Sequence, residues 1–278
     1  MTKSLNRVIL ESVLFVAIMG FSSQTHSHRV RRCSPRTSTL TFPDDFKYCK
    51  ADSSNSSCLV DLIQDTLIKL GTKGISSPIN FNINPMTLDF WNFQVEVDAV
   101  KTHEYFWDLK HPTLWNATVL FASFDTSSLT LTYTTFHDHL AQYNGRYKIW
   151  GQLYHDQDSN PEVIYGNGTA DRHVYNLTLE HTIVFVPADI KNTQYFFVGS
   201  YDLTVIGFTD ATFNYQNLYN GDQTLGKRAG YLMNENAVKI VFHQVDSFTE
   251  LLVTMLKQYT QTLVSSVPSS KILAHLAG

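Results

Sequence analysis

The feature that most constrains the fold is an apolar stripe of helical spacing near the carboxyl end of the chain. No proline interrupts the segment from the turn signal Asn220-Gly221-Asp222 to Pro268, so a single helix of about 40 residues, roughly 60 Å long, is sterically allowed. The lack of a sustained heptad repeat with charged flanks argues against a coiled coil and favours a sheet that wraps along the helix. The stripe recurs at steps of three and four: Val238, Val241, Phe242, Val245, Phe248, Leu252, Met255, Leu256, Tyr259 and Leu263.

From Gln94 to Leu218 the apolar period changes to two, which is typical of half-buried strands. Asn144-Gly145 and Gly166-Asn167-Gly168 are turn signals, and no helical pattern intervenes, so we expect an antiparallel sheet. Its apolar face must be buried, and the long helix is the only large candidate. The alternating sets are Val95, Val97 and Ala99; Leu129, Leu131 and Tyr133; Tyr147, Ile149 and Leu153; Leu177, Leu179 and Ile183; and Phe213 with Tyr215.

Two shorter segments precede the strands. Residues Cys58 to Leu70 carry leucines and isoleucines on one side and predict a short amphipathic helix, with Gly71 as its terminator. Residues Gly74 to Phe93 are rich in Asn, Pro and Ser and predict an irregular connection. Gly226 and Gly230 favour fraying or bending of the long helix, at about 1 kcal/mol each relative to Ala.

The amino-terminal residues predict export. Residues 1–27 combine a basic start, an apolar run from Val13 to Phe21 and small residues at the expected cleavage points, which is typical of a secretory signal peptide. The apolar run is far shorter than the ~20 residues of a spanning helix, so we expect no stable membrane insertion. Residues 28–41 form a flexible basic leader, in which Arg29 to Arg32 also matches a dibasic processing site, and residues 42–278 form one secreted, extracellular domain.

In a secreted protein, cysteines can form disulfides and the asparagines of Asn-x-Ser/Thr tripeptides can be glycosylated. Cys49 and Cys58 flank a polar turn and are expected to form a disulfide worth roughly 2 to 3 kcal/mol, while Cys33 is free, intermolecular or a competing partner. The tripeptides at Asn55, Asn116, Asn167 and Asn176 predict surface N-glycosylation. The net charge of −4 argues against a nucleic-acid partner, because phosphate binding needs clustered Lys and Arg.

The sequence offers no convincing catalytic centre. It lacks the Gly-x-Ser-x-Gly, His-Glu-x-x-His and P-loop motifs, so we expect no enzyme activity and no cofactor. An extended His137-Asp138-His139 would direct both imidazoles to one face, but no third ligand is identifiable, so solvated histidines are expected and not a metal site. His181 shares the phase of Leu177 and Leu179, which predicts a core position. Inward hydroxyls that need partners are expected at Tyr133, Tyr147, Tyr201 and Tyr215.

The order of these elements resembles the arthropod takeout and haemolymph juvenile-hormone-binding family. Similarity extends from about Phe42 to Leu273 and is most specific near the carboxyl end. The residues that carry it are Phe42-Pro43-Asp44 leading to Cys49 and Cys58; the strand from Gly145 to Leu153, similar to G-x-Y-x-x-x-G-x-L; Asn217 to Leu225 and Leu232 to Asn236, similar to "NLFNGD…L" and "LNEN"; and Val267-Pro268 at the end of the helix.

The resemblance implies an α+β fold in which a highly curved antiparallel sheet rolls around one long carboxy-terminal helix, the super-roll of BPI-like proteins. It also implies an apolar tunnel for a small hydrophobic ligand such as a terpenoid or fatty acid. Two alternatives remain open: a secreted glycoprotein with a filled core that acts through protein–protein contacts, and a hydrolase with an unrecognised site. The candidate ligand-binding residues are Tyr133, Tyr147, His181, Tyr201, Val245, Phe248, Leu252, Met255 and Tyr259.

Overall fold

The computed structural model describes residues 56–74, 83–155, 160–265 and 267–276. The predicted signal peptide and leader lie outside the described residues, as do Cys33, Cys49 and Asn55. The elements are α2 (Ser56–Thr72), β1 (Met86–Val97), β2 (Val100–His111), β3 (Thr118–Asp125), β4 (Thr130–Leu153), β5 (Glu162–Ile190), β6 (Thr193–Gly207), β7 (Asp210–Tyr215), the 3₁₀ turn η1 (Tyr219–Gly221), α3 (Gln223–Glu235), α4 (Ala237–Val264) and α5 (Ser269–Leu276).

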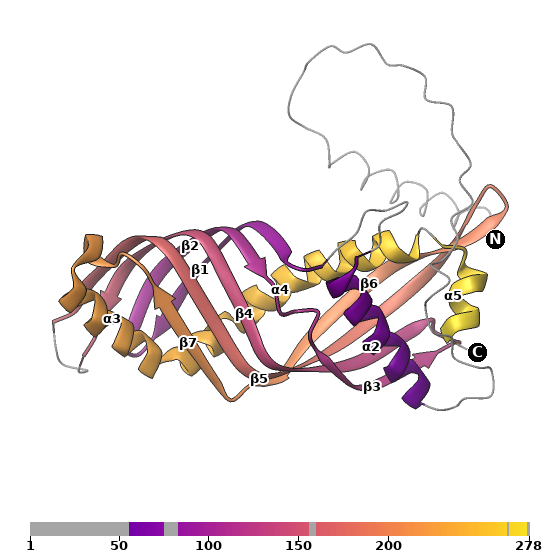
Figure 1. Ribbon diagram of the computed structural model, residues 1–278, viewed down its shortest axis with the longest axis horizontal. Coiled ribbons are helices and arrows are strands. Elements are labelled where there is room, and N and C mark those ends of the chain that lie inside the picture. The colour runs from indigo at the N-terminus through magenta and orange to yellow at the C-terminus, as the bar shows by residue number, and fades with distance from the viewer. Residues whose placement is uncertain (1–55, 75–82, 156–159, 266, 277–278) are drawn as a thin grey trace, which may run out of the picture. The chain divides into compact units, whose positions relative to one another are not determined.

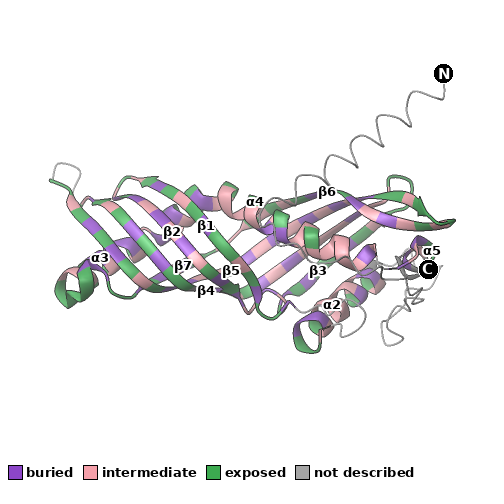
Figure 2. Ribbon diagram, turned by 90° about the horizontal axis from the view of Figure 1, so that it is seen from above, coloured by how far each residue is buried: buried purple, intermediate pink, exposed green. Residues whose placement is uncertain are grey.

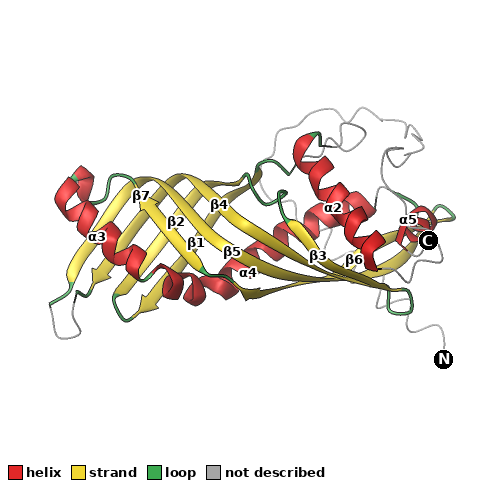
Figure 3. Ribbon diagram, turned by 60° about the horizontal axis from the view of Figure 1, so that its bottom comes forward, coloured by secondary structure: helices red, strands yellow, loops and turns green. Residues whose placement is uncertain are grey.

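The strands form one curved antiparallel sheet that wraps around helix α4 (Figure 1). Within the described residues it has seven strands in the order β1-β2-β4-β5-β6, while β3 pairs with β4 and β7 pairs with β5. Helix α4 contacts β1, β6 and β7, whereas α2 lies against β3 (Figure 3). The predicted α+β class and the rolled sheet are therefore confirmed.

Strands β4 and β5, of 24 and 29 residues, are longer than the turn signals predicted. They pair from Thr130↔Val184 to Leu153↔Glu162, so the expected turns at Asn144-Gly145 and Gly166-Asn167-Gly168 are wrong. The first is an irregularity where the register shifts, as at a β-bulge. In the second segment, Gly166-Asn167-Gly168, the backbone is crowded by another part of the chain. A Cβ on Gly168 would lie 2.5 Å from the carbonyl oxygen of Gln216. These glycines permit close backbone approach within a strand and do not reverse the chain.

The predicted single helix of about 40 residues is two helices. Asn236, with ψ near 7°, separates the 13-residue α3 from the 28-residue α4. The amide of Asn234 binds the backbone N–H and C=O of Phe213 on β7, at 2.7 and 2.9 Å, and so fixes the end of α3 to the sheet. The sequence conceals this break because no proline lies between Asp222 and Pro268, while the apolar stripe falls entirely within α4.

Helix α2 confirms the predicted amphipathic helix, but Gly71 does not terminate it. The helix continues to Thr72, and the residue with positive φ after it is Gly74. Gly71 instead contacts Trp115, since a Cβ there would lie 2.2 Å from the indole ring. The irregular connection predicted through Phe93 is also wrong from Met86 onward, where β1 begins, because exposed Phe90 on the outer face obscures the alternation.

The core lies between the concave face of the sheet and α4. Along the strands buried and exposed residues alternate, as Figure 2 shows. Fully buried side chains come from several strands and from the helix, among them Phe106, Ile149, Leu179 and Ile240. Within the described residues, none of the helices has the length and apolar composition that crossing a membrane would require.

Candidate ligand-binding site

Two cavities lie along α4, and the larger has a volume of about 210 Å³. An apolar cavity of about 150 Å³ is already large enough for benzene, so this one accommodates part of a hydrophobic molecule. Helix α2, the inner face of the sheet, the second half of α4 and α5 all contribute to its wall. The lining residues are Leu62, Ile63, Thr66, Leu67, Leu70, Ile83, Met86, Leu114, Leu131, Tyr133, Ile183, Phe185, Tyr201, Leu256, Tyr259, Thr260, Leu263, Val264 and Ile272.

A chain of hydroxyl and imidazole groups begins at this wall, where Tyr133 and Tyr201 line the cavity, and continues behind it. The hydroxyls of Tyr133 and Tyr201 are 3.1 Å apart, and Tyr201 is 2.8 Å from Nδ1 of His181. The other ring nitrogen of His181 is 3.0 Å from the hydroxyl of Thr135. Burial lowers the pKa of His181 to about 3 and raises the pKa of Tyr133 to about 12, so both side chains are neutral at physiological pH.

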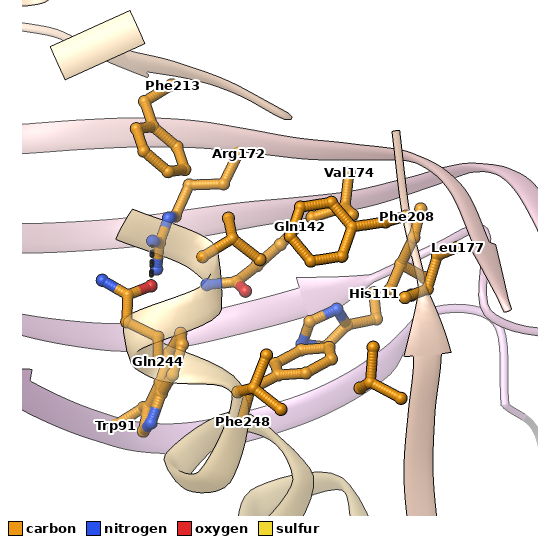
Figure 4. A pocket seen from close by; sticks show the side chains of 14 residues that line it. Trp91, His111, Gln142, Arg172, Val174, Leu177, Phe208, Phe213, Gln244 and Phe248 are labelled. Atoms are coloured by element: carbon orange, nitrogen blue, oxygen red, sulfur yellow. Dashed lines mark hydrogen bonds between the residues drawn. The ribbon is translucent and has the colours of Figure 1, made fainter. Parts of the chain in front are cut away.

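The smaller cavity, of about 40 Å³, lies beside the first half of α4 and has a more polar wall (Figure 4). A space of this size holds a water molecule or two, or a small polar group. Arg172 donates from Nη2 to the side-chain oxygen of Gln244 at 2.5 Å, joining β5 to α4. The lining residues are Trp91, His111, Leu140, Gln142, Arg172, Val174, Leu177, Val205, Phe208, Phe213, Val241, Gln244, Val245 and Phe248.

Arg172 is only 5% exposed and is held mainly by aromatic rings. Its guanidinium carbon lies 4.6 to 5.4 Å from the centroids of four rings, those of Trp91, Phe93, Phe106 and Phe213, within the range of cation–π attraction. The nearby carboxyl of Glu104 accepts hydrogen bonds from Tyr215 at 2.5 Å and Thr102 at 3.0 Å. Burial raises the pKa of Glu104, although Arg172 and these two hydroxyls oppose that shift.

The predicted ligand-binding residues are distributed between the two cavities. Tyr133, Tyr201 and Tyr259 line the larger one, and Val245 and Phe248 line the smaller one. His181 is buried as predicted and does not line the larger cavity, but it is hydrogen-bonded to Tyr201, which does. The remaining three line neither cavity and are buried in the core: Tyr147, which donates to the Gln216 carbonyl, Leu252 and Met255.

The sequence did not single out Arg172, His111, Gln244 or the α2 face as lining residues. Arg172 lies in phase with Ala170 and Val174, which are inward positions, so the alternation alone could have placed its side chain inside. A charged residue is normally expected to face solvent, so the alternation at Arg172 was not taken as evidence for an inward side chain. His111 at the end of β2 and Gln244 within the apolar stripe of α4 carried no comparable signal.

The His137-Asp138-His139 prediction is partly wrong. His137 is 3% exposed and lies near Thr135, and burial lowers its pKa to about 4. His139 instead meets His173, with ring nitrogens 2.6 Å apart, so the two imidazoles of the motif do not converge. The motif lies within β4, which continues to Leu153, and His137 is buried although the sequence had predicted solvated histidines. In the part of the chain that the structure describes, no three His, Cys, Asp or Glu side chains gather as a metal site would require.

The predicted covalent modifications stay predictions. Asn116, Asn167 and Asn176 are exposed, as glycan acceptors must be, and Asn55 lies outside the described residues. Cys58 is at the start of α2, while Cys49 lies outside the described residues, so their pairing stays a prediction as well.

Comparison with known proteins agrees with this architecture. The crystal structure of Epiphyas postvittana Takeout 1 is similar, with a TM-score of 0.67 and 17% identity over 81% of this chain and 97% of that one. A crystal structure of lipopolysaccharide binding protein gives a TM-score of 0.35 with 12% identity, covering 75% of this chain and 41% of that one. No curated protein matches. The family model described as haemolymph juvenile hormone binding protein matches residues 27–274, and the chain therefore belongs to that family.

Proposed function

We propose that this protein is a secreted, non-enzymatic carrier that binds a small hydrophobic molecule, such as a terpenoid or fatty acid, inside the roll of the sheet. The observation that carries the proposal is the larger cavity of about 210 Å³, which is apolar except for a few hydroxyls and lies between α2, the sheet and α4. Membership in a family of juvenile hormone binding proteins supports it. A signal peptide over residues 1–27 fits this role, and amino-terminal sequencing of secreted material tests it.

The physical driving force would be the burial of apolar ligand surface, at roughly 25 cal/mol per Å². Micromolar affinity requires about 8 kcal/mol, which a ligand of modest size reaches if few of its polar groups lose their partners. The hydroxyls of Tyr133 and Tyr201 offer such partners on the sheet side, and Tyr259 adds a third hydroxyl from α4. These groups orient a ligand, and the surrounding leucines and isoleucines supply the affinity.

A matched pair of tryptophan substitutions on α4 tests the proposal. Leu256 lines the larger cavity, whereas Leu252, one turn earlier, is 0% exposed and lines neither cavity. Leu256→Trp should occupy part of the cavity, weaken the binding of a hydrophobic fluorescent dye or a fatty acid, and change the melting temperature little. Leu252→Trp should overpack the core, at about 1 to 3 kcal/mol, with binding retained by the folded fraction.

The measurements are dye or fatty-acid titration and thermal melting of wild type and both variants. Wild-type protein that shows no saturable binding to dyes, terpenoids or fatty acids would rule out the carrier function. The filled-core glycoprotein that acts through surface contacts would then replace it. Equal destabilisation by both substitutions would show that the larger cavity is not available in solution.

A further inference from the structure

The smaller cavity contains more hydrogen-bond donors than the protein itself satisfies. Nε of Arg172, Nε2 of Gln244 and both ring nitrogens of His111 are buried and bond to none of the described residues. The three side chains are at most 5% exposed, and all three line the cavity. In Figure 4 Arg172 and Gln244 meet from opposite walls, with His111 on a third side. Buried polar atoms without partners are uncommon and costly, so each of them calls for an explanation.

The chemistry of these atoms specifies what would satisfy them. A guanidinium nitrogen and an amide nitrogen only donate, and the Gln244 amide orientation is set because its oxygen accepts from Arg172. Burial and the neighbouring Arg172 lower the pKa of His111 to about 4, so the neutral ring has one donor and one acceptor at pH 7. The wall of the cavity therefore contains at least three unsatisfied N–H donors beside a space of about 40 Å³, and a compact group of oxygen acceptors would match them.

The electrostatics favour an anion over a neutral acceptor. No carboxylate of the described residues lies within ion-pair distance of Arg172. Its nearest acidic neighbour, Glu104, is bound by Tyr215 and Thr102, and burial disfavours its charged form. Aromatic rings cover the guanidinium but add no formal charge. A carboxylate offers two acceptor oxygens and the charge that this environment lacks.

The two cavities lie along the same helix. Gln244 and Thr260 are 16 residues apart on α4, which corresponds to about 24 Å along its axis. One buried cluster joins them: it contains Leu140 and Leu177 from the smaller cavity, Met86 from the larger one, and Met255. The unbranched side chain of Met255 adapts its shape readily, so its movement would open a path for a flexible alkyl chain between the two spaces.

We propose that the smaller cavity is a head-group site, in which Arg172, Gln244 and His111 bind the carboxylate of a long-chain fatty acid whose alkyl chain extends along α4 into the larger cavity. This inference rests on the proposed carrier function and narrows it to acidic lipids. Neutral esters of the same chain length would occupy the larger cavity without the charge-assisted bonds.

A series of ligands with one alkyl chain and different head groups tests the proposal: palmitate, methyl palmitate and cetyl alcohol, each displacing a hydrophobic dye from the full-length secreted protein at pH 7. Palmitate should bind at least about tenfold more tightly than methyl palmitate, because hydrogen bonds to a charged group are worth about 1.5 to 3 kcal/mol. The paired variant Arg172→Met with Glu104→Gln removes the cation without leaving an isolated buried acid. It should abolish that difference by weakening palmitate more than methyl palmitate.

His111→Leu is a second variant, in which a loss of palmitate affinity would not be caused by a loss of stability. Because the ring nitrogens have no partner among the described residues, the substitution should leave the melting temperature unchanged or raise it, while palmitate affinity falls about fivefold. Leu256→Trp is the control and should weaken all three ligands together. Equal binding of the three ligands by wild type, unaltered by Arg172→Met/Glu104→Gln, would overturn the head-group site and leave the carrier function standing. Failure of every ligand and of the dye would instead refute the carrier function.

Discussion

At the scale of single residues, buried histidines make the stability of this protein depend on pH. The pKa of His181 is about 3 in the fold against an ordinary 6.5, because burial, and secondarily His137, disfavours its charged form. The unfolded chain therefore binds a proton at His181 that the folded chain does not bind. The free energy of unfolding falls as the pH drops below about 6.5. The groups facing His181 are Thr135, Tyr201, Tyr133 and His137.

We expect His181→Gln, which keeps a donor and an acceptor but cannot titrate, to reduce this acid sensitivity. Between pH 7 and pH 5 wild type should lose about 2 kcal/mol through His181, a loss that the variant lacks. Urea denaturation at both pH values measures it. The readout is the difference between the two proteins, because Glu104, whose pKa is raised, acts in the opposite direction in both. A stability difference that stays constant with pH would contradict the assignment.

At the scale of elements, one strand glycine and one helix glycine are under opposite constraints. A Cβ on Gly151 in β4 would lie 2.0 Å from the carbonyl oxygen of Lys101 on β2, whereas a Cβ on Gly230 in α3 meets nothing within 4 Å. Gly151→Ala should therefore separate two paired strands and cost at least about 1 to 3 kcal/mol. Gly230→Ala should stabilise the protein by up to about 1 kcal/mol, since alanine is the better helix former. Chemical denaturation of the two variants gives the comparison, and destabilisation by both would show that α3 is not formed as described.

At the scale of the whole molecule, Met255 lies between the residues that line the two cavities. Met255→Ala should widen the passage between the cavities, lengthen the longest alkyl chain that binds, and cost about 2 to 5 kcal/mol. Ile240→Ala is the matched control, because Ile240 is equally buried and lines neither cavity. Competition by a series of alkyl chains of increasing length measures the effect. The same length limit in both variants and wild type would show that the cavities are already continuous or cannot be joined.

The sequence by itself determined the class of fold and its layers. The period of two between Gln94 and Leu218 and the period near 3.6 after Gln223 are local signals, so they predicted an antiparallel sheet, a long carboxy-terminal helical region and the helix α2. The carboxy-terminal motifs gave the family resemblance. The phase of His181 predicted its burial, because the position of a side chain relative to a sheet follows from alternation alone.

Only the tertiary structure decided where the strands end, where the helix breaks and which side chains meet. Gly166 and Gly168 looked like a turn because local sequence does not show that Leu218 and Gln216, which follow β7, approach them. Asn236 separates two helices because Asn234 binds β7, a contact between residues 21 positions apart. The donors at Arg172, Gln244 and His111 come from β5, α4 and β2, which the rolling of the sheet around α4 brings to one cavity. Such sites depend on long-range packing, and no periodicity in the chain records that packing.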